Sequence, residues 1–247
     1  MKRVNTLLTL ALALQTFALF PHTASAVEEA VAATTPESRL DQDWWQSRFL
    51  EKLRDKDARK DEIELVFIGD SITHGWENAG EELWEEHFAP YGALNLGYSG
   101  DRTEHVVWRI QHGEVAYLDP KGVVIMIGTN NTGHRMDAAE HTAVGIMMIL
   151  DELNQRLPDA KVLLLGIFPR DAQPGDEMRT RNSEINALIA DFDWRPNVSF
   201  LNVNDVFLTE DGDLSLEVMP DLLHPRGAGY KLWADAILPA VKEMMEE

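Results

Sequence analysis

Short apolar segments recur along the chain at intervals that leave room for a helix between them. Each is rich in Val, Ile and Leu and has few polar positions, which is typical of strands buried on both faces of a parallel sheet. Glycine and polar residues follow most of them directly. The predicted strands are residues 63–69, 93–97, 122–128, 161–168 and 197–203.

Amphipathic patterns with helical spacing fill the intervals between these strands. The predicted helices are residues 40–60, 79–89, 103–115, 137–156, 176–192 and 227–245. In the first of them, Trp44, Trp45, Phe49 and Leu53 fall within a charged stretch and indicate a helix that packs on the body of the protein. The alternation of strand and helix predicts one doubly wound α/β domain.

The first residues have the pattern of a secretory signal peptide. "MKR" supplies positive charge, "LLTLALALQTFALF" supplies an apolar stretch, and Ala24-Ser25-Ala26 fits a small-residue cleavage site. The apolar stretch is short for a membrane span, and an uncleaved N-terminal anchor remains the alternative. We expect cleavage near Ala26 and a secreted or periplasmic protein. Its segments would be the signal peptide (1–26), a leader and packing helix (27–60, with 27–39 flexible) and the main domain (61–247).

Composition narrows the classes of function. The chain has no cysteine, which excludes disulfides, a lipid anchor on cysteine and cysteine catalysis. Its formal net charge is -20, and removing Lys2 and Arg3 with the signal peptide takes it to -22. Such a surface repels nucleic acid and anionic membranes. We therefore expect a small-molecule or glycan substrate, no nucleic-acid partner and no stable membrane insertion after signal removal.

Polar residues follow the predicted strands at the point where each strand ends. In an open α/β sheet, ligands bind beyond the carboxyl ends of the strands, so these loops should meet at one edge. Hydrolysis of an ester by a serine needs a base, a carboxylate that orients the base, and donors for the oxyanion. The loops are Gly69-Asp70-Ser71, Gly97-Tyr98-Ser99-Gly100-Asp101, Gly128-Thr129-Asn130-Asn131 and Phe168-Pro169-Arg170.

A serine, an aspartate and a histidine in these positions fit that chemistry. Ser71 comes at the first strand-to-helix turn, and "MPDLLHPRGAGY" places Asp221 three residues before His224. The oxyanion donors would be the Ser71 N–H, the Gly97 N–H and the Asn130 amide. Each residue also has an ordinary structural interpretation, since serine after Gly-Asp often caps a helix and Asp-x-x-His often forms a surface turn. Their joint occurrence at strand ends favours catalysis.

The blocks "GDSITHGW", "NLGYSGDRT", "GTNN" and "DLLHP" resemble the four motifs of the SGNH (GDS-type) esterase/lipase superfamily. They are most similar to the branch with the catalytic subunits of platelet-activating-factor acetylhydrolase and their bacterial relatives. The resemblance implies a flavodoxin-like three-layer α/β/α sandwich with five parallel strands. It also implies Ser71 as nucleophile, His224 as base and Asp221 as its orienting carboxylate, with Ser71, Gly97 and Asn130 forming the oxyanion hole.

Two further features refine this interpretation. The resemblance assigns Asp70 a supporting role, in which its carboxylate binds loop N–H groups and holds the turn. The Gly-x-Ser-x-Gly elbow of α/β-hydrolases is absent, because Thr73 stands where the second glycine would be. The histidines lack the spacing of a zinc site, and we expect no metal and no cofactor.

The substrate is less sharply defined by the sequence. The resemblance implies a short acyl group, and an exported acidic protein suits O-acetyl groups on carbohydrates. A lysophospholipase or thioesterase, a non-catalytic glycan-binding module, and acyl transfer to a sugar remain as alternatives. Tyr98, Asp101 and Arg102 follow a strand end, and we expect them to contact the substrate.

Overall fold

The protein, described here by a computed structural model for residues 31–246, is built on one parallel sheet. The strand order is β2-β1-β3-β4-β5, and every neighbouring pair is parallel. The strands are β1 (Leu65–Gly69), β2 (Leu94–Gly97), β3 (Gly122–Met126), β4 (Lys161–Leu165) and β5 (Val198–Leu201). The order reverses direction beside β1, which is where such sheets bind ligands.

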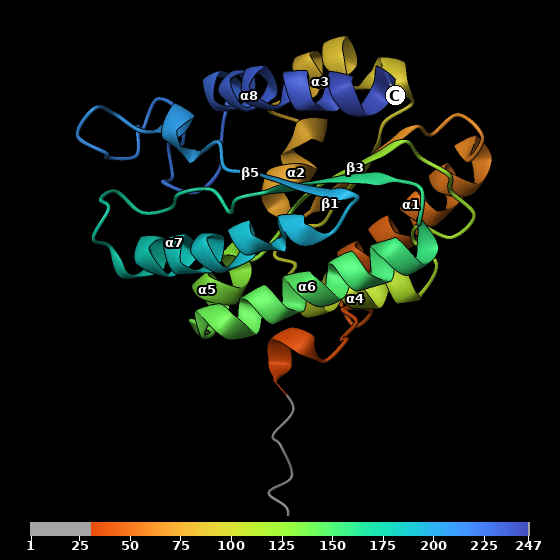
Figure 1. Cartoon of the computed structure of the whole chain (residues 1–247), viewed down its shortest axis with the longest axis horizontal. Coiled ribbons are helices and arrows are strands. Elements are labelled where there is room, and N and C mark those ends of the chain that lie inside the picture. Colours follow the sequence, from red (N-terminus) through yellow and green to blue (C-terminus); the bar gives the residue numbers. More distant parts are fainter. Residues whose placement is uncertain (1–30, 247) are drawn as a thin grey trace, which may run out of the picture.

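Helices cover both faces of the sheet. Figure 1 shows α3 and α8 on one side and α4, α6 and α7 on the other. The predicted three-layer α/β/α sandwich is thereby confirmed. The α-helices are α1 (Asp43–Arg59), α2 (Ser71–His74), α3 (Glu81–His87), α4 (Thr103–Gln111), α5 (Thr129–Arg135), α6 (Ala139–Arg156), α7 (Glu177–Ile189) and α8 (Gly227–Glu246). The short 3-10 helices are η1 (Ala32–Thr34), η2 (Gly75–Glu77), η3 (Ala89–Tyr91), η4 (Ala190–Trp194) and η5 (Asn204–Phe207).

Alternation along each strand divides the core into two layers. In β1, Val66 and Ile68 belong to the cluster under α4, α6 and α7, whereas Leu65 and Phe67 belong to the cluster under α3 and α8. All five residues of β1 are buried. Apolar side chains on both faces explain why the strand reads as a continuous apolar run.

The predicted strand over 161–168 ends early, at Leu165. Just beyond it, the side chain of Asn186 accepts a hydrogen bond from the Ile167 N–H at 2.7 Å and donates one to the Ile167 carbonyl at 2.8 Å. A side-chain amide here takes the place of a neighbouring strand, because it offers the same donor and acceptor as a peptide group. The backbone can therefore leave the sheet without losing its hydrogen bonds.

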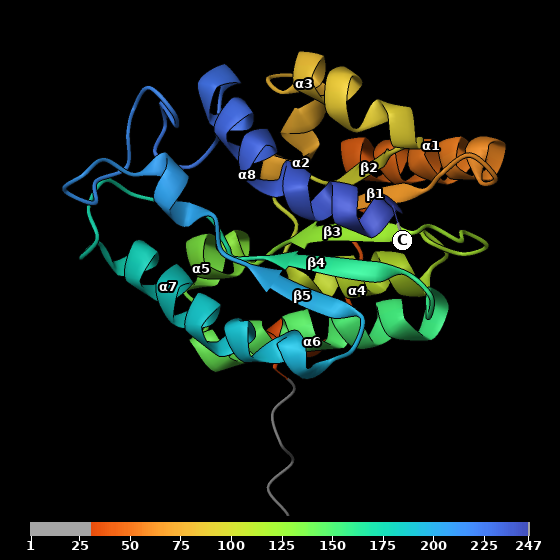
Figure 2. The same ribbon diagram turned by 45° about the horizontal axis from the view of Figure 1, so that its top comes forward.

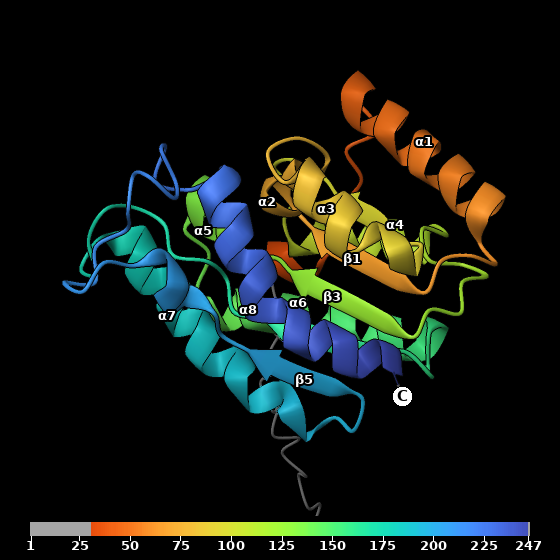
Figure 3. The same cartoon turned by 90° about the horizontal axis from the view of Figure 1, so that it is seen from above.

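The N-terminal segment is packed against the body, which corrects the prediction of a flexible leader for its residues 31–39. Ala33 is buried, and its carbonyl accepts a hydrogen bond from the Thr103 hydroxyl at 2.8 Å. Helix α1 then lies at the β2 edge of the sheet (Figure 2; Figure 3), where Trp45 and Phe49 pack with Tyr98. The predicted signal peptide and residues 27–30 lie outside the described residues.

Candidate active site

Ser71 is the first residue of α2, immediately after β1 ends at Gly69. The Asp70 carboxylate caps this helix, since its Oδ1 accepts a hydrogen bond from the Ile72 N–H at 3.0 Å. This is the supporting role expected for Asp70. The Ser71 N–H has no partner among the hydrogen bonds of residues 31–246, as is normal for the first N–H of a helix. It is therefore free to bind an anion.

His224 reaches Ser71 from the other end of the sequence. Its Nε2 lies 2.9 Å from the Ser71 Oγ, and 153 positions separate the two residues. The imidazole sits in the loop just before α8, with about a third of its side chain exposed. The predicted serine–histidine pair is thus brought into hydrogen-bond contact in an accessible position.

Asp221 completes the relay through a tight turn. Its Oδ2 lies 2.7 Å from His224 Nδ1, and its Oδ1 accepts hydrogen bonds from the N–H groups of Leu223 and His224 at 3.1 and 2.7 Å. Leu222 adopts a left-handed conformation with φ of 57°, which lets the carboxylate fold back onto the histidine. Partial burial alone would raise the pKa of Asp221, but these hydrogen bonds and the nearby imidazole lower it below its usual value.

Asn130 lies at the start of α5, directly beyond β3. Its Nδ2 donates a hydrogen bond to the Asp101 carbonyl at 2.9 Å, and the residue is only 6% exposed. A primary amide carries two N–H groups, so a second donor remains on the same nitrogen. The hydrogen bond to Asp101 fixes the orientation of that second donor and ties α5 to the loop after β2.

The prediction that the Gly97 N–H serves as an oxyanion donor is wrong. That N–H donates to the Asn95 Oδ1 at 2.8 Å and is not available to a substrate. Gly97 has a structural reason to be glycine, because a Cβ there would come within 2.2 Å of the backbone nitrogen of His74. The residue allows α2 to approach β2 closely and so places Ser71.

Gly100 offers the backbone donor that Gly97 lacks. Residues 98–101 form a turn in which the Asp101 N–H donates to the Tyr98 carbonyl, and Gly100 has φ of 76°, as at the third position of a type II turn. The Gly100 N–H has no hydrogen-bond partner in the described part of the chain. Both features favour Gly100 over Gly97 as the loop's contribution to an oxyanion hole.

Arg39 stabilises this turn through hydrogen bonds from its guanidinium group. Its Nη1 donates to the Ser99 carbonyl at 2.8 Å and to the Asp101 carboxylate at 3.0 Å. In a trans peptide the C=O and the following N–H point in opposite directions. Because Arg39 fixes the Ser99 carbonyl, it also fixes the direction of the Gly100 N–H. A second arginine of the N-terminal segment, Arg48, similarly donates to the Gly97 carbonyl at 2.8 Å.

Tyr98 and Asp101 do not contact substrate, contrary to the prediction, because both are completely buried. The Asp101 carboxylate accepts hydrogen bonds from Trp45 Nε1 at 2.8 Å and Arg109 Nε at 2.9 Å. The guanidinium of Arg109 lies over the Tyr98 ring and also binds the Glu114 carboxylate. Burial raises the pKa of Asp101 although Arg109 opposes it, and burial raises the pKa of Tyr98 well above its usual value. These residues form a buried charged network under the turn.

Arg102, the third predicted substrate contact, is also engaged elsewhere. Its Nε donates to the Glu104 carboxylate at 2.6 Å. Glu104 and His105, with Glu37, make up the one carboxylate and histidine group of residues 31–246 with spacing that can hold a metal ion. Glu104 is already paired with Arg102 and Arg135, and His105 Nδ1 accepts a hydrogen bond from the Arg102 N–H. These partners leave the group poorly suited to a cation.

Ser71 and His224 open into a surface hollow of about 340 Å³. Several wall residues were not predicted from the sequence, among them His74 and Ser99, whose Nδ1 and hydroxyl oxygen lie 3.1 Å apart. Burial, with the positive charge of Arg48, lowers the pKa of His74 to about 4, so its imidazole is neutral above that pH. The remaining lining residues are Gly75, Asn78, Ala79, Pro225, Arg226 and Tyr230.

Comparison with known sequences gives a consistent family assignment. The sequence model of the GDSL-like lipase/acylhydrolase family matches residues 67–232. Human platelet-activating factor acetylhydrolase IB subunit alpha1 is 40% identical over 175 residues, which cover 70% of this chain and 73% of that protein. The alpha2 subunit from Gallus gallus is 36% identical over 209 residues, which cover 83% and 86%.

Solved structures share the fold at lower sequence identity. A GDSL-like lipase from Bacteroides thetaiotaomicron has a TM-score of 0.64 at 23% identity, over 79% of this chain and 98% of that one. An acetylxylan esterase from Geobacillus stearothermophilus has a TM-score of 0.55 at 20% identity, over 71% and 92%. At this level of identity the similarity concerns the architecture of the sheet and its helices.

Proposed function

The chain belongs to the GDSL-like lipase/acylhydrolase family and is a carboxylic ester hydrolase, and we propose that it removes short acyl groups, above all O-acetyl groups on carbohydrates, through an acyl-enzyme on Ser71. The observation that carries the proposal is the hydrogen-bond relay from Ser71 through His224 to Asp221, with distances of 2.9 and 2.7 Å. A serine hydroxyl needs such a base to act as a nucleophile near neutral pH.

In the first half of the reaction, Ser71 Oγ attacks the ester carbonyl carbon while His224 Nε2 accepts its proton. Asp221 holds the imidazole through Nδ1 and stabilises the imidazolium that forms. The imidazolium then returns the proton to the alcohol oxygen as the carbon–oxygen bond breaks. In the second half, His224 deprotonates a water as that water attacks the acyl-enzyme carbonyl carbon, and the imidazolium then returns the proton to Ser71 Oγ as the acyl–Oγ bond breaks and the carboxylic acid leaves.

The oxyanion of each tetrahedral intermediate is stabilised by donors that are fixed before the reaction begins. We assign this role to the Ser71 N–H, the Gly100 N–H and the Asn130 side-chain amide. Each is anchored by a neighbouring contact: α2 by the Asp70 cap, Gly100 by Arg39 behind the turn, and Asn130 by the Asp101 carbonyl. Donors held in this way need no reorganisation as charge develops, and so stabilise the transition state more than the ground state.

The lining of the hollow supports a short acyl group. Its walls are mostly polar or small, with Ala79, Pro225 and the Tyr230 ring as the apolar exceptions. The large apolar side chains that are exposed elsewhere in the described residues do not line it. A long acyl chain would therefore lie on polar surface and lose the favourable burial that lipid-binding grooves provide.

The carbohydrate as acyl carrier is supported by three observations. One structural neighbour is named as an acetylxylan esterase, an enzyme whose acyl carrier is a glycan. The hollow offers polar side chains such as Asn78 and Arg226 to an acyl carrier. The strong negative charge disfavours anionic surfaces and suits a neutral glycan.

A phospholipid or another lipid ester is the second candidate, because the relatives most similar in sequence are acetylhydrolases of platelet-activating factor. Within residues 31–246, no helix combines the length and apolar character needed to cross a bilayer. We also propose that the protein is exported after cleavage near Ala26, on the sequence pattern of residues 1–26. Export would place it where glycans are accessible.

The experiment is a chain-length series of p-nitrophenyl esters combined with acetate release from acetylated glycans and from platelet-activating factor. We expect the highest kcat/KM at acetate, and release from an acetylated glycan that Ser71→Ala abolishes. A maximum at octanoate or longer would overturn the short-acyl proposal. Faster hydrolysis of the phospholipid than of every glycan would replace the carbohydrate with a lipid.

A further inference from the structure

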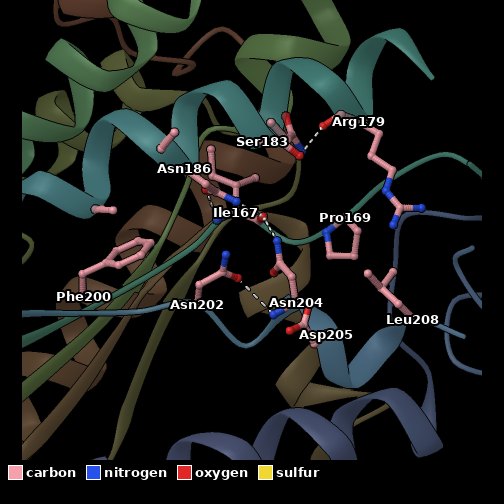
Figure 4. A pocket seen from close by; sticks show the side chains of 13 residues that line it. Ile167, Pro169, Arg179, Ser183, Asn186, Phe200, Asn202, Asn204, Asp205 and Leu208 are labelled. Atoms are coloured by element: carbon pink, nitrogen blue, oxygen red, sulfur yellow. Dashed lines mark hydrogen bonds between the residues drawn. The ribbon is translucent and has the colours of Figure 1, made fainter. Parts of the chain in front are cut away.

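A second hollow lies on the same edge of the sheet, beyond the carboxyl ends of β4 and β5. Its volume is about 380 Å³, and it shares no lining residue with the hollow around Ser71. Figure 4 shows the side chains of α7, including Arg179, Ser183 and Asn186, facing those of the segment after β5. This volume lies within the range of pockets that hold small ligands.

Asparagine side chains dominate the lining, and most of their groups are already used. Asn186 pairs with both backbone groups of Ile167, and Asn204 Nδ2 donates to the Ile167 carbonyl at 2.9 Å (Figure 4). Asn182 Nδ2 donates to the Phe168 carbonyl at 3.2 Å and to the Thr129 hydroxyl at 3.3 Å. These bonds fix the amides as rigid walls rather than as mobile surface groups.

The oxygens of two of these amides lack partners. Asn182 Oδ1 and Asn204 Oδ1 are inaccessible to bulk solvent and accept no hydrogen bond from any residue of 31–246. Asn182 as a whole is 1% exposed. Because neither oxygen is accessible, a ligand bound in the hollow does not reach them, and an acceptor that a ligand can reach is the exposed carboxylate of Asp205.

The charges of the lining argue for a neutral ligand. The guanidinium of Arg179 is held by hydrogen bonds to the carbonyls of Ala172 and Gly212, and Asp205 in the same lining balances its positive charge. Asp205 is the single carboxylate in the lining, and none of the hydrogen bonds or ion pairs of the described residues uses its side chain. One carboxylate with scattered amide oxygens in a hollow of this size does not form the close oxygen shell that a divalent cation requires.

Apolar surface completes the lining. In Figure 4 the Phe200 ring lies to one side of the labelled amides, and the side chains of Pro169 and Leu208 lie to the other. A sugar ring combines the two properties required here, because it has hydroxyl groups that donate hydrogen bonds and C–H faces that pack on apolar side chains. A simple anion, metal ion or fatty acyl chain lacks one property or both.

We propose that this hollow is a second, non-catalytic binding site for a sugar residue of a neutral glycan. Hydroxyl groups of the sugar donate to the Asp205 carboxylate, and its C–H face packs against Phe200. The site binds sugar without any acyl group. It therefore stands independently of the proposed esterase substrate.

The test measures binding of unacetylated xylotetraose and cellotetraose by isothermal titration calorimetry. The protein is the full mature chain with Ser71→Ala, which removes any contribution from ester chemistry. The blocking variant is Ala187→Trp, because Ala187 is exposed on α7 and lines the hollow. The matched control is Leu188→Trp, the neighbouring position, which is exposed on α7 and does not line it.

We expect saturable binding of at least one tetrasaccharide, weakened at least about tenfold by Ala187→Trp and unchanged by Leu188→Trp. In the Ser71 background, Ala187→Trp should leave hydrolysis of p-nitrophenyl acetate unchanged and the thermal unfolding midpoint close to that of the parent. Absence of saturable binding by both sugars would overturn the site, as would binding that Ala187→Trp does not weaken. Neither result would affect the esterase proposal, whose test is acetate release.

Discussion

The two hollows on the carboxyl edge are built from different kinds of side chain. On the side of the Ser71 hollow, beside β1 and β2, the loops are supported by buried ion pairs, with Asp101, Arg109 and Glu114 all completely buried. The half beside β4 and β5 rests on neutral amides, with Asn182 and Asn186 bound to backbone groups. The same fold supports both, because its parallel strands all end at this edge.

The difference follows from what each half must do. A site that stabilises developing charge needs fixed donors, and the network of Arg39, Asp101 and Arg109 holds the Gly100 turn in one conformation. A site that only binds a neutral ligand needs hydrogen-bonding groups of the right geometry and no charge. The comparison therefore predicts that substitutions in the two halves affect different measurements.

Replacing the nucleophile should abolish ester hydrolysis at the first hollow without affecting sugar binding at the second. Ser71→Ala should lower kcat for p-nitrophenyl acetate by about 10⁴–10⁶-fold, because the hydroxyl that forms the acyl-enzyme is gone. The matched control is Ser99→Ala, a second serine that lines the same hollow without contacting His224. Its kcat should stay within about tenfold of the parent. Comparable losses in both variants would contradict the assignment of Ser71.

Removing the side-chain donor should slow chemistry without weakening binding. Asn130→Ala should lower kcat by about 10²–10³-fold and leave KM nearly unchanged, because the amide acts on the oxyanion. Asn204→Ala, in the other half of the edge, removes the same chemical group and should leave kcat unchanged. Steady-state kinetics of the two variants decide the point, and a large rise in KM for Asn130→Ala would instead indicate a ground-state contact.

The cap of α2 should make stability depend on pH. Burial raises the pKa of Asp70 from 3.8 to about 7, because its carboxylate loses solvent and its Oδ2 has no partner in the described chain. Between these two pH values the folded state holds a proton that the unfolded state releases. The contribution of this carboxyl group to the free energy of unfolding is therefore lost as pH rises from about 4 through about 7.

Asp70→Asn keeps an acceptor for the Ile72 N–H and removes the titration. The unfolding free energy of the variant minus that of the parent should increase by on the order of 3 kcal/mol from pH 4 to pH 8. Urea unfolding at each pH measures this difference. Parallel pH profiles for the two proteins would show that Asp70 is not protonated in the fold.

Removing the Arg39 hydrogen bond to the turn at residues 98–101 should lower turnover less than the substitutions of Ser71 and Asn130. Arg39→Ala removes the donor to the Ser99 carbonyl and should lower kcat by about tenfold with little change in KM, because the Gly100 N–H loses its fixed direction. Arg59→Ala, in the same N-terminal segment, is the control, since Arg59 binds the Gly92 carbonyl away from the site. An unchanged kcat in Arg39→Ala, with normal folding, would show that the turn is rigid without Arg39.

The sequence predicted the fold and the Ser71–His224 contact well because both follow from local patterns. Apolar runs of strand length set the sheet, and polar residues at strand ends had to meet at its edge. The Asp221–His224 spacing was informative because a carboxylate three residues away can fold back onto the same imidazole. These features depend little on distant parts of the chain.

The errors on Tyr98 and Asp101 involve contacts across long sequence distances, whereas those on Gly97 and Arg102 involve side chains two positions away. Tyr98 and Asp101 were expected in the cleft as loop residues, but α1, which comes some fifty positions earlier, covers them through Trp45. Gly97 and Gly100 are equivalent in the sequence, and only the Asn95 side chain and a positive φ distinguish them. The second hollow was not predicted, because Asn182 and Asn186 fall within the predicted helix 176–192, where polar residues usually face solvent.

The account depends above all on Ser71 being the residue that becomes acylated. Mass spectrometry of the protein after reaction with a fluorophosphonate ester measures this directly. We predict one covalent adduct, on Ser71, formed much more slowly in His224→Ala. An adduct on Ser99 or another residue, or an equal rate of labelling in His224→Ala, would contradict the proposed relay.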